Sequence, residues 1–275
     1  RRQRQMCIRD SKKTALGRRR TTWAEQTEEI VVNTDEFIEK EPLTIILSAM
    51  GWIRAAKGTL DLNSLDLKFK EGDELQFAFH AMSTDKINLF TSGGKMFTLA
   101  ANELPSARGF GESVRLMADI GADENIVRAF VLNTGAKYLL VGRHGTGFIV
   151  SGENCLAQTK NGKQVMNTDA ANPAIMCVPV TGDTIAMSGS NDKLLIFGAD
   201  EIPEMTRGKG VILQKYNADR TYVLDVMFFN AADGFGWTTG RGTTKLDDWA
   251  PWRGKRASQG RTVPLGFPRT GKFTK

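Results

Sequence analysis

Basic residues recur at one distance along the chain, and this spacing is the clearest chemical pattern in the sequence. Four of them lie 21 or 22 positions after the start of an apolar segment: Arg108, Lys160, Arg207 and Arg256. Glycine follows most of them, as Arg-Gly or Lys-Asn-Gly, and glycine lets a backbone approach a phosphate closely. The same glycines would also suit a tight turn between structural units. On these residues alone the anion-binding and the structural interpretation carry equal weight.

The apolar segments that precede these residues have a common pattern. Each has an apolar run, a turn centred on glycine or Asn-Asp and a second apolar run, which predicts a β-hairpin. They cover residues 45–53, 87–99, 138–150 and 185–197, with a weaker copy from Phe235. Their starts are 42, 51, 47 and 50 residues apart, a period typical of propellers. We therefore predict an all-β fold over residues 42–275, with about five four-stranded blades.

The charges are distributed unevenly. The chain of 275 residues has a formal net charge of +6. Residues 1–20 carry +8 and residues 241–275 carry +7, which leaves −9 for the segment between them. Basic ends on an acidic body favour a polyanionic partner such as nucleic acid. We interpret residues 1–11 as a non-native leader, so they do not enter the fold prediction.

Composition narrows the protein class. Hydrophobic residues make up 41% and charged residues 25%, as in soluble globular proteins. No apolar run approaches the ~20 residues that a membrane-spanning helix needs, so no membrane partner is expected. Three cysteines without a CxxC pair predict neither a disulfide framework nor a zinc site. A reduced, cytoplasmic protein is expected.

Catalytic and metal-binding patterns are weak. The segment Gly266–Lys272 has the spacing of a phosphate-binding loop, but Pro268 lies inside it and Phe273 replaces the required Ser or Thr. His80 and His144 belong to different repeats. No nucleophile, base and orienting group can be combined, so no catalytic residue, metal ligand or cofactor is predicted in this chain.

Several motifs resemble one protein family. Residues 41–58 (EPLTIILSAMGWIRAAKG), 69–75 (FKEGDEL), 103–112 (ELPSARGFGE) and 207–210 (RGKG) occur in an order that resembles the C-terminal domain of the A subunit of bacterial topoisomerase IV. This type IIA topoisomerase domain is a β-pinwheel, or broken propeller, related to that of the gyrase A subunit. Residues 16–22 (LGRRRTT) resemble the end of the breakage–reunion domain. Residues 12–41 would therefore be the end of that domain and a linker.

The resemblance carries implications beyond the fold. The whole A subunit works with the B subunit of topoisomerase IV and with a second A subunit, and the holoenzyme uses ATP and Mg²⁺ through other domains. All three tyrosines of this chain, Tyr138, Tyr216 and Tyr222, lie in the pinwheel repeats, so the catalytic tyrosine is absent. The chain would thus be a non-catalytic part of an isomerase, and whether to class it as an enzyme stays open. The gyrase signature Gln-Arg-Arg-Gly-Gly-Lys-Gly is replaced by residues 67–72, which favours topoisomerase IV over gyrase.

These lines lead to one functional hypothesis. The chain would bind and bend double-stranded DNA near the nucleoid, positioning duplex segments for strand passage during decatenation and supercoil relaxation. A propeller that serves as a protein-interaction platform is the alternative, and a propeller enzyme is a weaker third. We predict ten DNA-contacting residues: Arg54, Lys57, Arg108, Lys160, Lys163, Arg207, Lys209, Arg253, Lys255 and Arg256.

Overall fold

Five β-hairpins form where the sequence alternates apolar runs and turns. The computed structural model describes residues 39–62, 67–217, 220–240, 242–246 and 248–274, and predictions for residues 1–38 lie outside these ranges. The hairpins are β1 (Pro42–Ser48) with β2 (Trp52–Lys57), β4 (Lys86–Thr91) with β5 (Lys95–Ala100), β8 (Lys137–Gly142) with β9 (Thr146–Ser151), β12 (Thr184–Gly189) with β13 (Lys193–Gly198), and β16 (Phe235–Thr239) with β17 (Gly242–Leu246). The all-β fold and the five hairpins are confirmed.

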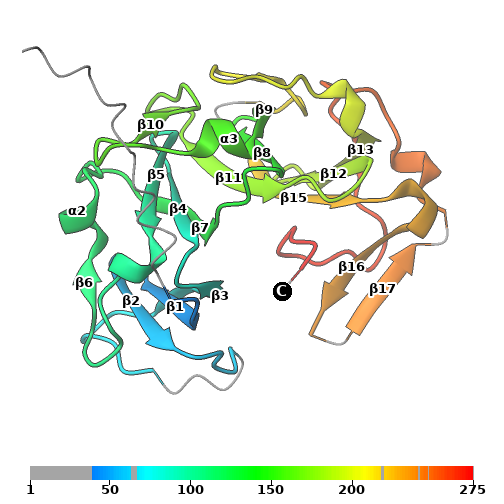
Figure 1. The fold of residues 1–275 in the computed structure, drawn as a ribbon. Helices are drawn as coiled ribbons and strands as arrows, with labels where there is room; N and C mark the ends of the chain where they lie inside the picture. The colour runs from blue at the N-terminus through cyan, green and yellow to red at the C-terminus, as the bar shows by residue number, and fades with distance from the viewer. Residues whose placement is uncertain (1–38, 63–66, 218–219, 241, 247, 275) are drawn as a thin grey trace, which may run out of the picture. The chain divides into compact units, whose positions relative to one another are not determined.

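Four of the hairpins gain a strand on each side (Figure 1). The inner strands are β3 (Leu75–Met82), β7 (Ile126–Val131), β11 (Ala174–Pro179) and β15 (Val223–Phe229). The outer strands are β6 (Glu112–Ser113), β10 (Lys163–Gln164), β14 (Val211–Ile212) and β18 (Arg261–Thr262). The orders across the sheets are β3-β1-β2-β6, β7-β4-β5-β10, β11-β8-β9-β14 and β15-β12-β13-β18.

Each outer strand belongs to a sheet other than that of the hairpin before it. For example, β6 follows the hairpin β4–β5 in the chain but pairs with β2 of the first sheet. In the same way β10, β14 and β18 return to the sheets that precede their own hairpins. Consecutive blades are thus joined by exchanged strands, which is the topology that makes this propeller a pinwheel.

The core lies between consecutive sheets, in four apolar clusters. Neighbouring residues of one strand face opposite blades: Tyr138 and Leu140 pack toward the second blade, whereas Leu139 and Val141 pack toward the fourth. Side chains alternate across a strand, so a strand buried on both faces must be apolar at nearly every position. This explains the continuous apolar runs of the sequence.

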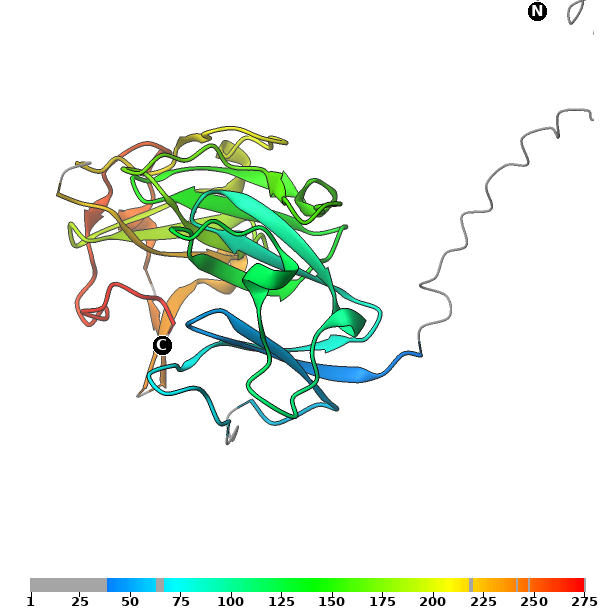
Figure 2. The ribbon, with the colours of Figure 1, turned by 90° about the vertical axis from the view of Figure 1, so that its left-hand side faces the viewer.

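The inner strands surround the middle of the fold. β3 lies beside β7, β7 beside β11 and β11 beside β15. They line a central cavity of about 800 Å³, which residues Lys272 and Thr274 of the C-terminal segment also border. Figure 2 shows the successive sheets from the side of the first blades.

The fifth sheet differs from the prediction because it has two strands instead of four. The C-terminal segment packs beside it: the Thr238 amide donates to the Phe273 carbonyl at 2.7 Å, and the Phe273 ring meets Phe235 edge to face. The Phe273 amide in turn donates to the Asp225 carboxylate of β15 at 2.8 Å. This segment therefore joins the fourth and fifth blades without forming a regular strand.

Helical turns are short and lie between strands. They are η3 (Ala101–Glu103), α2 (Val114–Met117), α3 (Gly152–Cys155), η4 (Ala199–Glu201), η5 (Ala231–Asp233) and η6 (Ala250–Trp252). Among the described residues no helix has the length and apolar character needed to cross a membrane.

Candidate nucleic-acid interface

The segments that lead into the four outer strands all end in the same kind of backbone turn. A glycine with positive φ precedes every outer strand: Gly111, Gly162, Gly210 and Gly260. A Cβ at Gly210 would lie 2.4 Å from the Gly147 carbonyl oxygen, and one at Gly260 would lie 2.4 Å from the Leu194 carbonyl oxygen. Both the φ value and the lack of space therefore require glycine at these turns.

The register of the outer strands is also the same in all four sheets. The first residue of each outer strand pairs with the second residue of the adjacent hairpin strand, as Val211 does with Gly147 and Arg261 with Leu194. Corresponding side chains are therefore presented at corresponding points on the outer edges of successive blades. We call residues 106–111, 158–162, 205–210 and 253–260 the rim segments.

Most of the predicted contact residues lie exposed in the rim segments. Within the described part of the chain, five of these side chains have no hydrogen bond or ion pair: Arg108, Lys160, Lys209, Arg253 and Lys255. Such cations are free to meet an anion without first breaking a contact. They come from the rims of four successive blades.

Three other predicted residues are partly engaged. The Arg207 Nε donates to the Asn167 side-chain oxygen at 3.2 Å, and Arg207 is exposed. Arg256 is half-buried and donates to the Ile212 carbonyl at 2.8 Å, which ties its rim segment to β14. Lys163 is half-buried as the first residue of β10.

Arg54 has a structural role in the described fold. It is 6% exposed, and its guanidinium donates to the carbonyls of Gly109 and Lys68, the latter at 3.0 Å. The guanidinium also lies over the Phe69 ring, 5.4 Å from the centroid. Burial lowers the pKa of Arg54. Because the Arg54 guanidinium is buried and bonded to the Gly109 carbonyl of the first rim segment, we do not propose Arg54 as a surface contact.

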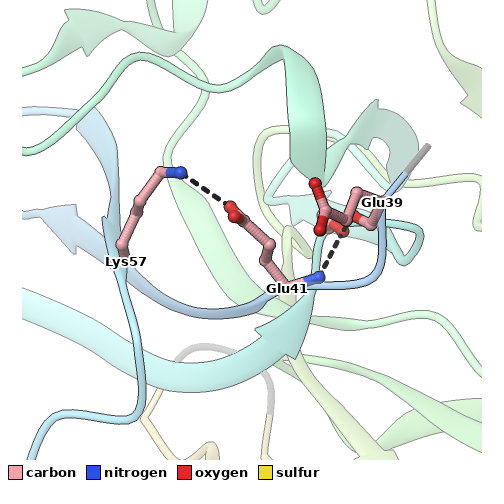
Figure 3. Close-up of polar contacts among 4 residues, drawn as sticks. Glu39, Glu41 and Lys57 are labelled. Carbon is pink, nitrogen blue, oxygen red and sulfur yellow. Dashed lines mark hydrogen bonds and ion pairs between the residues drawn. The ribbon is translucent and has the colours of Figure 1, made fainter.

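Lys57 lies at the end of β2 and forms an ion pair with Glu41. The Lys57 Nζ donates to the Glu41 carboxylate at 2.8 Å (Figure 3). The hydrogen bond and the charge of Glu41 raise the pKa of Lys57. Glu41 offsets the lysine charge, which weakens Lys57 as a site for an anion.

The sequence prediction missed basic residues of the outer edge. Arg261 is exposed in β18 at the position that Lys163 has in β10. Lys193 and Lys95 each begin the hairpin strand that receives an outer strand. Aligning the repeats on the turning glycines, instead of on the hairpin starts, would have found Arg261.

The cysteines, residues 266–272 and the metal-ligand residue types give no second candidate site among the described residues. Cys155 and Cys177 are buried in the cluster between the second and third blades, and burial raises the pKa of Cys155 to about 12 and that of Cys177 further. Residues 266–272 lead directly into Phe273, which is buried, and residues 266–274 contain no helix. In the described ranges, no three His, Cys, Asp or Glu residues are grouped to hold a metal ion.

Comparison with known proteins agrees with this architecture. The family model for the DNA gyrase C-terminal domain, a beta-propeller, matches residues 85–133 and 183–228. These two stretches begin at the second and fourth hairpins, so the model recognises the repeating unit itself.

Similar sequences identify the family. The chain is 43% identical to the A subunit of DNA topoisomerase 4 from Rickettsia conorii over 264 residues, which is 95% of the chain and 35% of the relative. It is 45% identical to the corresponding A subunit from Caulobacter vibrioides over 242 residues, 87% of the chain and 31% of the relative. The chain belongs to the family of DNA topoisomerase 4 A subunits. It spans about a third of the length of these curated relatives.

A solved structure supports the fold assignment. The E. coli ParC C-terminal domain is similar with a TM-score of 0.71 and 22% sequence identity, covering 83% of this chain and 96% of that domain. Within the family of topoisomerase 4 A subunits, this chain thus has the fold of the C-terminal β-pinwheel, as its motifs predicted.

Proposed function

We propose that the chain is the DNA-binding and DNA-bending part of a topoisomerase IV A subunit. One observation carries the proposal: a common backbone turn presents exposed basic side chains on the outer edges of four successive blades. Such a curved row of cations suits the backbone of a bent duplex. Phosphate contacts of this kind position DNA without reading its sequence.

The basic rim segments can contribute to bending. Smoothly bending a site of 20–30 base pairs costs on the order of 1–6 kcal/mol, which the added phosphate contacts can offset. The chain would then hold duplex segments for ATP-dependent strand passage by the holoenzyme, and so bias decatenation and supercoil relaxation. The fragment itself would be non-catalytic.

The proposed partners follow from the family. They are double-stranded DNA, the B subunit of topoisomerase IV and a second A subunit, and the protein partners would be contacted by parts of the protein outside this chain. The holoenzyme would use ATP and Mg²⁺ outside this chain, in the cytoplasm and in association with the nucleoid. A general protein-interaction platform is not favoured, since the relatives are DNA topoisomerase subunits.

A salt titration of duplex binding tests the proposal. The isolated chain should bind duplexes of unrelated sequence with similar affinity, and log affinity should fall by about 0.9 per log salt for each phosphate contact. Charge reversal of Arg207 and Lys209 together should weaken binding strongly. Affinity that stays constant between roughly 50 and 200 mM salt would overturn the proposal.

A matched variant separates charge from folding. Leu265 is fully exposed on the C-terminal segment, so Leu265→Ala should leave both affinity and unfolding unchanged. If the Arg207 and Lys209 reversal had no more effect than this control, DNA would not follow the rim.

A further inference from the structure

The first and third rim segments align at the turn and differ there in one residue. Residues 108–111 read Arg-Gly-Phe-Gly and residues 207–210 read Arg-Gly-Lys-Gly. Their final glycines have φ values of 86° and 76°, and both lie against the carbonyl of the adjacent hairpin strand. Phe110 therefore takes the rim position that Lys209 has two blades later.

Phe110 is the apolar exception at this position. The residues that precede the turning glycines in the other three blades are Asn161, Lys209 and Gln259, and all are exposed. Phe110 is also 46% exposed, and its neighbour Arg108 is exposed without a partner among the described residues. An exposed aromatic residue thus lies two positions from a free cation and borders the same cavity, at a point where the other blades present polar residues.

The backbone next to Phe110 is held in place by the buried Arg54 side chain. The Arg54 guanidinium donates to the carbonyl of Gly109, immediately before Phe110, and to the carbonyl of Lys68. Phe110 borders an open cavity of about 560 Å³ with Leu60 and Ala107 at its side. A buried arginine under the loop fixes the peptide on which the exposed ring is mounted.

An exposed aromatic ring beside an arginine has a defined use on a DNA surface. Apolar side chains such as Phe insert between base steps from the minor groove and kink the duplex, while neighbouring basic side chains hold the phosphates. We propose that Phe110 is an apolar wedge against the minor groove, with Arg108 on an adjacent phosphate. The first blade would then kink the duplex, whereas the next three blades hold its backbone. This inference rests on the proposed binding of DNA along the rim.

The experiment compares Phe110→Ala and Phe110→Lys with wild type and with Leu265→Ala. End-to-end energy transfer on a labelled ~30 base-pair duplex reports the bend, and a 2-aminopurine in a central TA step reports unstacking. Phe110→Ala should weaken binding by about tenfold and remove the unstacking signal, with an unchanged salt slope. Phe110→Lys should recover affinity and increase the salt slope by about 0.9, without restoring the bend.

The outcomes separate the wedge from DNA binding itself. If wild type binds and bends DNA but Phe110→Ala equals it in bend and unstacking, the wedge is wrong and DNA binding stands. That result would point to a protein contact at this patch. If Phe110→Lys bends DNA as wild type does, the bend does not need an aromatic ring at this position, and the proposal that Phe110 is a wedge is contradicted. If wild type fails to bind any duplex, the proposed function fails as well. A thermal melt of each variant shows whether the fold is retained.

Discussion

The first and fourth blades present different side chains on the same turn of backbone. In the first blade the rim offers one free cation, Arg108, and the aromatic ring of Phe110. In the fourth blade Arg253, Lys255 and Arg261 are all exposed. The glycine turn is required for folding, so it recurs, whereas the charges beside it are free to differ from blade to blade. The fourth blade should therefore contribute more to the affinity for a polyanion than the first blade does.

Removal of the fourth-blade cations should have the largest effect. The triple change of Arg253, Lys255 and Arg261 to Ala should lower the salt slope by about 2.7 and weaken binding about 10²–10³-fold at roughly 0.1 M salt, because three phosphate contacts are lost. Arg108→Ala, the matched change in the first blade, should lower the slope by about 0.9 only. Fluorescence anisotropy over a salt series measures both. Equal slopes for the two variants would contradict the larger contribution of the fourth blade.

The shared turn can be tested by the same substitution in both blades. Gly111→Ala and Gly260→Ala should each reduce the free energy of unfolding by about 2–4 kcal/mol, because a Cβ meets a strand carbonyl and the positive φ is strained. Gly234 has φ 80° but open space around it, so Gly234→Ala should cost only about 1 kcal/mol. Urea unfolding measures all three. A large difference between the first two variants would show that the turns are not equivalent.

Arg54 and Arg108 should separate stability from binding within the first blade. Arg54→Met removes the two hydrogen bonds that the guanidinium donates to the carbonyls of Gly109 and Lys68, so the free energy of unfolding should fall by about 1–3 kcal/mol with an unchanged salt slope. Arg108→Met should change the slope and leave stability alone. Urea unfolding and salt titration of both proteins give the four values. A lowered salt slope for a folded Arg54→Met would place Arg54 at the DNA surface after all.

Lys57 should have the smallest effect. Its ion pair with Glu41 is solvent-exposed, and such pairs add little to stability. Lys57→Ala should therefore leave the unfolding midpoint unchanged and alter the salt slope less than Arg108→Ala does. Glu41→Gln frees the lysine and should strengthen binding slightly. If Lys57→Ala matched Arg108→Ala in the salt titration, Glu41 would not neutralise it in the complex.

The sequence predicted the first four hairpins clearly because each contains two apolar strands buried on both faces, whereas β17 of the fifth hairpin is largely polar and exposed. It predicted four-stranded blades but did not locate the outer strands, since a strand of two residues such as Lys163 and Gln164 is too short to show a period. The two-stranded fifth sheet was missed because β18, the strand that follows its hairpin, pairs with β13 and so belongs to the fourth sheet.

The contact residues were predicted unevenly for a related reason. An offset in the sequence located Arg108 and Arg207 at matching turns. It could not distinguish Arg54 from them, because the loop carbonyls that bury Arg54 are distant in sequence. Arg261 was missed because its rim segment is longer before the turning glycine. Which of the predicted residues touch DNA stays a prediction.

The exchanged outer strands have a consequence for folding during synthesis. β2 reaches the ribosome exit well before β6, the strand that completes its sheet, and the whole hairpin β4–β5 must emerge between them. At about 5–20 residues per second, each blade waits several seconds with an open edge. Each sheet should therefore be completed only after the hairpin of the next blade has been synthesised, starting with the N-terminal sheet. Until then the edge of the hairpin is unpaired and can pair with an edge of a neighbouring nascent chain.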